Sequence, residues 1–185
     1  VATIAPVSSA LPRSVVRITA PGGYCSGVVV ERDAVLTCGH FFRERKTSEV
    51  RVLIDGTRHR ISAITLYPGT DLALVKLKRA VDVAPLEIGP APKVGARTVT
   101  LGFGGHAAAP SARPGRFLGA LPLAVSRGAQ TIVRPAGFIY TSPPAVKGDS
   151  GGPVLVDGKV VGVQSLILDP WGTNLRVATV NLLRP

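Results

Sequence analysis

Short runs of Val, Ile and Leu, each bounded by turn-forming residues, recur along the whole chain. In residues 72–78, even- and odd-numbered positions would lie on opposite faces of a strand, and both faces carry apolar side chains. Runs of this length and composition predict β-strands. The first half of the chain contains six of them: residues 14–18, 27–30, 34–37, 50–54, 60–65 and 72–78. The second and third predict a hairpin that turns at residues 31–33.

The pattern is interrupted between residues 83 and 95, where the chain becomes Pro-rich and loses alternation. Such a segment is typical of a linker between lobes. The second half shows the same pattern and predicts about six strands, give or take one, among seven candidate runs. These runs are residues 98–103, 118–125, 131–133, 138–140, 154–156, 159–168 and 176–182. The fold class predicted is all-β, with two six-stranded antiparallel barrels that leave no long sheet edge exposed. We expect lobe 1 at about 14–82, a linker at about 83–95 and lobe 2 at about 96–185, together one domain.

Composition supports the all-β prediction, since the 185 residues include 21 Gly and 16 Pro. No apolar run approaches the roughly 20 residues that span a bilayer, so no membrane span is expected. The chain begins at Val1, has no methionine and shows no signal-peptide pattern. We expect it to start either at a natural processing site or at a trimmed end.

The formal net charge of +11 would attract acidic polymers such as nucleic acid, anionic lipid or cell-wall material. The basic residues are scattered, however, and no aromatic residues alternate with them to stack on bases. The sequence therefore favours a solvated basic surface and no specific nucleic-acid site. Acidic polymers stay open as charge-attracted partners.

The strongest candidate for chemistry is the segment Gly148-Asp149-Ser150-Gly151-Gly152-Pro153. Its glycines permit a sharp turn that presents the Ser150 hydroxyl, with the backbone N–H groups of Gly148 and Ser150 facing outward. Such donors can stabilise the oxyanion that forms when a serine attacks a carbonyl. The alternative is a β-turn that only leads into a strand.

Two further residues suit a triad with Ser150. His40 follows the run 34–37, at a strand end where a side chain can face a cleft, and Asp71 immediately precedes the run 72–78. The order His, Asp, Ser differs from that of nucleophile-elbow hydrolases and of subtilisin-like enzymes. For each residue alone, a structural role is the alternative, and His59 and His106 are expected to be structural or exposed.

These segments resemble the trypsin/chymotrypsin family of serine proteases. Thr37-Cys38-Gly39-His40 is similar to that family's T-A-A-H, residues 71–77 to its D-I-A-L-L-K-L, and residues 148–153 to its G-D-S-G-G-P. The resemblance implies a Ser150 nucleophile, a His40 general base, an orienting Asp71 and an oxyanion hole of Gly148 and Ser150. It also implies that no metal or cofactor takes part and that the lobes dock to form the cleft.

Two structural expectations also follow from the resemblance. Asp149 pairs in the family with a new apolar amino terminus, and Val1 falls close to that terminus; an internal partner for Asp149 is the alternative. Cys25 and Cys38 would be nearly opposite in the predicted hairpin. We expect a disulfide between them, with two buried thiols as the alternative.

By the same resemblance, the primary specificity pocket has Pro144 and Ala145 at its floor, where trypsin has an acid. Cleavage after Lys or Arg is therefore not expected. Ile167 would narrow the pocket and Lys147 would add positive potential. The expected preference is for small aliphatic side chains, with Asp/Glu as the second hypothesis if Arg176 faces the substrate rather than solvent. The walls predicted for this pocket are Ser165, Leu166, Ile167 and Arg176.

The prediction is a serine endopeptidase that hydrolyses a protein or peptide substrate through an acyl-enzyme. Because the family works mainly outside the cytoplasm, we expect a secreted or periplasmic location. The main rival is a catalytically silent, basic polyanion-binding homologue; an esterase with the same triad is a second.

Overall fold

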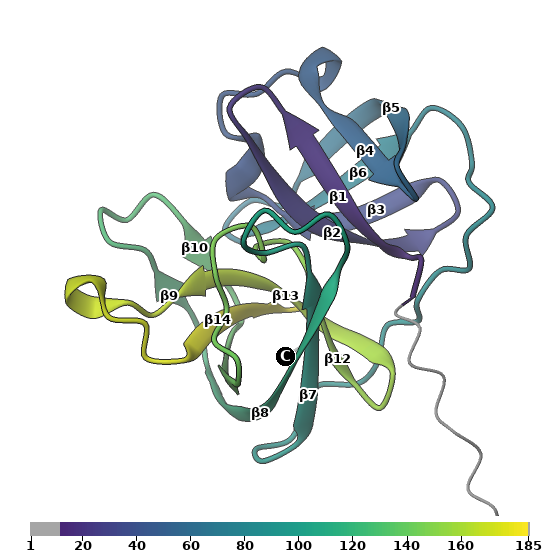
Figure 1. Cartoon of the computed structure of the whole chain (residues 1–185). Helices are drawn as coiled ribbons and strands as arrows, with labels where there is room; N and C mark the ends of the chain where they lie inside the picture. Colours follow the sequence, from purple (N-terminus) through teal and green to yellow (C-terminus); the bar gives the residue numbers. More distant parts are fainter. Residues whose placement is uncertain (1–11, 185) are drawn as a thin grey trace, which may run out of the picture.

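Two closed antiparallel β-barrels of six strands each make up residues 12–184, the part of the chain that the computed structural model describes (Figure 1). This confirms the predicted fold class. The first barrel has the order β1-β2-β3-β6-β5-β4. Its strands are β1 (Val15–Ala20), β2 (Gly23–Glu31), β3 (Ala34–Cys38), β4 (Arg51–Ile54), β5 (Thr57–Leu66) and β6 (Leu72–Leu77).

The second barrel has the order β11-β14-β13-β12-β7-β8. A separate two-stranded hairpin of β9 and β10 projects from it. The strands are β7 (Arg97–Gly102), β8 (Ser111–Leu121), β9 (Ala124–Val125), β10 (Ile132–Val133), β11 (Ala136–Thr141), β12 (Pro153–Val156), β13 (Lys159–Ile167) and β14 (Val177–Leu182).

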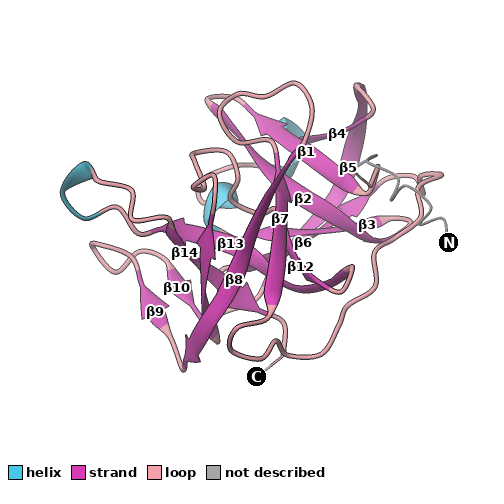
Figure 2. Cartoon of the chain, turned by 60° about the horizontal axis from the view of Figure 1, so that its bottom comes forward, coloured by secondary structure: helices cyan, strands magenta, loops and turns pink. Residues whose placement is uncertain are grey.

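Helical structure in the described residues is limited to three short 3₁₀ turns, as Figure 2 shows. They are η1 (His40–Phe42), η2 (Thr47–Glu49) and η3 (Pro170–Gly172). No helix in this part of the chain has the length and apolar character needed to cross a membrane.

Strand β8 differs from its prediction because it begins at Ser111, well before the expected start at residue 118. Pro114 and Gly115 read as a turn in the sequence, yet both lie inside the strand and pair with β7. The carbonyl oxygen of Tyr140 on β11 lies where a Cβ of Gly115 would be. The glycine here permits a close approach of two strands rather than a turn.

Apolar packing continues from one barrel to the other. The cluster that fills the first barrel, with Ile18 and Val35 fully buried, also includes Leu101 and Val163 from the second. A smaller cluster around Ile139 and Val180 fills the second barrel. Strand β3 is buried on both faces for this reason, since one face lines its own barrel and the other meets its neighbour.

The fold predicts that Ile18→Ala lowers the free energy of unfolding by about 2–5 kcal/mol, because it removes a fully buried side chain and leaves a cavity. Ile88→Ala is the matched control, since Ile88 is 43 % exposed and should cost less than about 1 kcal/mol. Urea denaturation followed by circular dichroism measures both. Equal losses in the two variants would contradict this description of the core.

Candidate active site

His40 and Asp71 are bonded to one another at the surface where the barrels meet. His40 begins η1 directly after β3, and Asp71 directly precedes β6, which pairs with β3. The Asp71 carboxylate accepts the His40 backbone N–H at 2.8 Å and faces Nδ1 of the imidazole, also at 2.8 Å. When Nδ1 carries the hydrogen, Nε2 keeps a free lone pair. This is the tautomer that a general base requires.

The carboxylate of Asp71 is only 2 % exposed, so its charge must be satisfied by protein groups. Besides His40, it accepts a hydrogen bond from the Ser165 hydroxyl of β13. The backbone of Asp71 is held on both sides, by Gly39 N–H at 2.9 Å and by the side chain of Asn181 at 2.9 Å. Ser165 and Asn181 both belong to the second barrel, so the two barrels together hold this acid.

Ser150 lies on a tight loop between β11 and β12. Gly148 (φ +100°) and Gly151 (φ +86°) adopt backbone angles that disfavour other residues. The Ser150 carbonyl accepts the backbone N–H of Ser26 on β2 at 2.8 Å, and its hydroxyl donates to the Ser165 carbonyl at 3.1 Å. Ser150 is thereby connected to Asp71 through one intermediate residue, Ser165.

The N–H groups of Gly148 and Ser150 face away from the packed side of this loop. The Lys147 carbonyl accepts from Gly105 N–H at 3.0 Å, and a trans peptide directs the Gly148 N–H the opposite way. The Asp149 carbonyl likewise accepts from Gly152 N–H at 3.0 Å, which turns the Ser150 N–H outward. Among the described residues neither N–H donates to a protein acceptor. These two N–H groups are the donors that the oxyanion hole expected from the sequence would use.

Asp149 has an internal partner, Arg113, which is the alternative that the sequence left open. Its carboxylate accepts from Arg113 Nε of β8 at 2.7 Å and from the N–H groups of Gly104 and Val146, each at 2.9 Å. These bonds fix the residue that separates the two outward N–H groups. Val1, the partner suggested by the family resemblance, lies outside the described residues.

The predicted disulfide is wrong: Cys25 and Cys38 are free, buried thiols, which was the alternative. The β2–β3 ladder pairs Gly27 with Thr37, and continuing that register places Cys38 opposite Ser26 rather than Cys25. The thiol of Cys25, together with burial, raises the pKa of Cys38 well above its ordinary value. Cys38 therefore stays a neutral thiol at physiological pH.

The pKa of His40 is raised above its ordinary value of 6.5. Partial burial of the ring lowers the pKa, but two neighbours outweigh this. Cys38 Sγ lies 3.9 Å from Nε2, where the neutral thiol sulfur can accept a hydrogen bond from the protonated ring, and the Asp71 carboxylate stabilises that ring from Nδ1. His40 therefore keeps its proton to higher pH than a free imidazole does, and it can act as a base once that proton is lost.

The residues predicted to form the specificity pocket follow the Ser150 loop and β13. Ala145 is buried, and its carbonyl accepts from Asn174 Nδ2 at 2.8 Å. Leu166 and Ile167 are half-buried, as is Pro144, whereas Lys147 is exposed. Pro144, which the family resemblance places at the floor of the pocket, carries no charge.

Arg176, which the sequence predicted on the other wall of the pocket, is exposed. Its guanidinium donates to Ser142 Oγ at 3.2 Å. Within residues 12–184 it forms no ion pair with a carboxylate.

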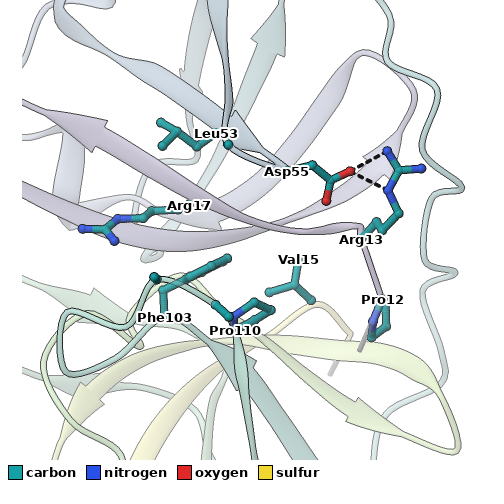
Figure 3. A pocket seen from close by; sticks show the side chains of 11 residues that line it. Pro12, Arg13, Val15, Arg17, Leu53, Asp55, Phe103 and Pro110 are labelled. Atoms are coloured by element: carbon teal, nitrogen blue, oxygen red, sulfur yellow. Dashed lines mark hydrogen bonds and ion pairs between the residues drawn. The ribbon is translucent and has the colours of Figure 1, made fainter. Parts of the chain in front are cut away.

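Two hollows border the candidate site, one beside His40 and Asp71 and one beside the end of β13. One of about 220 Å³ lies beside His40 and Asp71, between the β5–β6 turn and β10. Another of about 560 Å³ borders Leu166 and Ile167 and extends toward β9. A third, of about 660 Å³, lies apart from the triad candidates, between β1 and the segment after β7, with Arg13 and Asp55 paired at its rim (Figure 3). No cluster of three or more His, Cys, Asp or Glu side chains suited to a metal occurs in residues 12–184.

The family model of the trypsin-like peptidase domain matches residues 25–163 of this chain. The chain therefore belongs to this family. A protein of Bartonella henselae named "probable periplasmic serine endoprotease DegP-like" is 30 % identical over 161 residues, which are 85 % of this chain and 31 % of that protein. A relative in Buchnera aphidicola with the same name is 27 % identical over 82 % of this chain and 31 % of its own length. The chain thus spans about a third of these relatives.

Solved structures agree on the fold. The Rv3671c protease from M. tuberculosis in its active form has a TM-score of 0.77 at 22 % identity, over 96 % of this chain and 79 % of the other. Kallikrein-related peptidase 10 in complex with Zn²⁺ has a TM-score of 0.75 at 20 % identity, over 96 % and 93 %.

Three residues that contact the candidate site were missed by the sequence analysis: Ser26, Arg113 and Asn181. Asn181 had a detectable signal, because a polar residue interrupts the apolar run 180–183. Arg113 and Ser26 had none, since their roles depend on which strands become neighbours.

The site predicts that Cys38→Ala lowers the pKa of His40, because it removes the sulfur that stabilises the protonated ring. A general base works in its neutral form, so the acid limb of the pH profile of kcat/KM should move to lower pH. Peptide hydrolysis measured from pH 5 to 10 tests this, with Val52→Ala as the control, because it also truncates a buried side chain of the first barrel but lies on β4, which does not pair with β3. An unmoved limb would contradict the assignment.

Proposed function

We propose that this chain is a serine endopeptidase that cleaves proteins or peptides through an acyl-enzyme. One observation carries the proposal: His40, oriented by buried Asp71, shares its carboxylate partner with the Ser165 hydroxyl, and the Ser165 carbonyl in turn accepts from the Ser150 hydroxyl. In the described residues Ser150 Oγ and His40 Nε2 are not hydrogen-bonded to each other, because the hydroxyl donates to the Ser165 carbonyl and Nε2 faces Cys38 Sγ. The reaction therefore requires a side-chain rotation that brings these two atoms together.

In the first step, Ser150 Oγ transfers its proton to His40 Nε2 and attacks the carbonyl carbon of the scissile bond. The resulting oxyanion would accept hydrogen bonds from the N–H groups of Gly148 and Ser150. His40 then donates the proton to the leaving amine, the C–N bond breaks, and the acyl group stays on Ser150. Water, deprotonated by His40, hydrolyses that ester and restores the hydroxyl.

The raised pKa of His40 makes the neutral ring a stronger base toward the Ser150 hydroxyl, and hydrolysis should rise with pH as the ring loses its resting proton. Asp71 stabilises the imidazolium that forms in each half of the reaction. Every step uses side chains and backbone groups of this chain. The relatives are named periplasmic proteases, and we extend a periplasmic or secreted location to this chain as part of the proposal.

Ser150→Ala should abolish peptide hydrolysis while leaving the fold intact, because it removes the nucleophile but keeps the backbone bond of Ser150 to Ser26 and the Asp149 contacts that hold the loop. Active-site labelling with a fluorophosphonate, followed by mass spectrometry, should modify wild-type protein at Ser150 and leave the variant unmodified. Hydrolysis retained by the variant would refute the proposal. Absence of both labelling and hydrolysis in wild type would favour the silent polyanion-binding alternative, and ester turnover without amide turnover would favour an esterase.

For specificity, we propose small aliphatic P1 side chains, because Pro144 offers no charge and Ile167 restricts the wall. A second candidate, Asp or Glu, is supported by the guanidinium of Arg176, which has no carboxylate partner among the described residues. Arg176→Gln should then lower kcat/KM for P1 Glu substrates by at least about tenfold and leave P1 Ala substrates unchanged. A cleavage profile dominated by Lys or Arg would contradict both candidates.

A further inference from the structure

Asn181 is a fully buried polar residue on β14, in an otherwise apolar stretch of that strand. A primary amide loses free energy on burial unless its donors and acceptors find partners. Apolar neighbours such as Val180 and Leu182 line the second barrel. By strand alternation Asn181 faces away from that interior, toward the first barrel.

All four hydrogen-bonding positions of the amide are used. Oδ1 accepts from the backbone N–H of Asp71 at 2.9 Å and of Arg134 at 3.0 Å. Nδ2 donates to the Arg134 carbonyl at 2.9 Å and to the Leu182 carbonyl at 3.2 Å. An amide has two N–H donors and two acceptor lone pairs, so no capacity is left over. The side chain thus joins the start of β6, the end of β10 and β14.

The bond to Asp71 matters for the orientation of its carboxylate. Asp71 O accepts from Gly39 N–H, and Asp71 N–H donates to Asn181, so both peptide groups that flank the residue are fixed. With its backbone fixed, the carboxylate can meet the N–H and Nδ1 of His40 at once. Without Asn181, a buried N–H would lose its partner and the backbone here would be free to rotate.

We propose that Asn181 is a positioning residue for the hydrolytic reaction, which holds Asp71 from the opposite barrel so that His40 is oriented only when the barrels are docked. The proposal rests on the proposed function for its kinetic consequence. By this proposal, a residue of β14 that is not itself in the triad fixes the backbone of Asp71 through a direct hydrogen bond.

The main test replaces Asn181 by Leu, which is close in volume and removes all four bonds. Because misplacement of a catalytic group by about 1 Å can cost on the order of 10²-fold in rate, kcat should fall about 10- to 100-fold. KM should change less than about threefold, since no substrate-binding group is altered. Asn181→Asp should behave similarly, because it places carboxylate oxygens against the carbonyls of Arg134 and Leu182.

Arg43→Gln is the matched control for loss of a connection between the two halves. Arg43 follows η1 and donates to Gln130 O at 2.7 Å and Thr131 Oγ1 at 3.0 Å, beside β10, without touching Asp71. Its kcat should stay within about twofold of wild type. An equal loss of kcat in Arg43→Gln and Asn181→Leu would overturn the proposal, because general weakening of the interface would then explain both.

A double-mutant cycle separates positioning from structure. If Asn181 acts through Asp71, then Asn181→Leu should lower kcat much less in an Asp71→Asn background than in wild type. The same loss in both backgrounds would overturn the proposal.

Two measurements do not depend on activity. In wild type, the Asp71 amide should be among the slowest to exchange with deuterium, because its hydrogen bond is buried. In Ser150→Ala protein, NMR titration should give a lower His40 pKa when Asn181 is also replaced by Leu, because the Asp71 contact weakens.

Rapid exchange of the Asp71 amide or an unchanged His40 pKa would overturn the proposal. Wild type that hydrolyses no peptide would instead refute the proposed function, and if Asn181→Leu fails to fold, amide exchange in wild type still decides.

Discussion

The arrangement depends on hydrogen bonds exchanged between the two barrels. Asp71 belongs to the first barrel, yet Ser165 and Asn181 of the second hold it. The Ser150 loop belongs to the second barrel, and Ser26 of the first holds it, through its N–H to the Ser150 carbonyl and its hydroxyl to the Gly148 carbonyl. Each barrel therefore fixes the reactive segment of the other, and neither barrel alone contains a complete site.

Burial makes these bonds strong determinants of geometry. Removing water from around Asp71 and Asp149 leaves only protein donors to balance their charge. Asp149 uses Arg113 and two backbone N–H groups, and Asp71 uses His40, Ser165 and the His40 backbone. Displacing any donor would leave a buried charge underbalanced, so the carboxylates have few alternative positions. The continuous apolar cluster across the interface keeps water away from both.

Much of the architecture could be predicted because each strand carries its own signal. Alternating or continuous apolar runs predicted the two barrels, and the segments around His40, Asp71 and Ser150 had local features of their own. The early part of β8 could not be predicted, since Pro114 and Gly115 indicate a turn until one knows that β11 passes against Gly115.

The partners of the site were harder to predict for the same reason. Arg113 meets Asp149, and Asn181 meets Asp71, only through tertiary neighbours far away in the chain. Cys25 and Cys38 show how strongly such contacts depend on strand register. The β2–β3 register, continued by one residue, places Cys38 opposite Ser26, and a shift of one residue would have placed Cys38 directly opposite Cys25.

The loop between β13 and β14 has a spectroscopic consequence. It carries Trp171, the single tryptophan of the chain, at 95 % exposure on η3, which projects at the left edge of Figure 1. An indole surrounded by water already emits at long wavelength, so intrinsic fluorescence is a poor indicator of global unfolding in this protein. The same loop begins directly after Leu166 and Ile167, which the sequence predicted to form a wall of the specificity pocket. The fluorescence of Trp171 is therefore suited to report when a polypeptide binds over these residues.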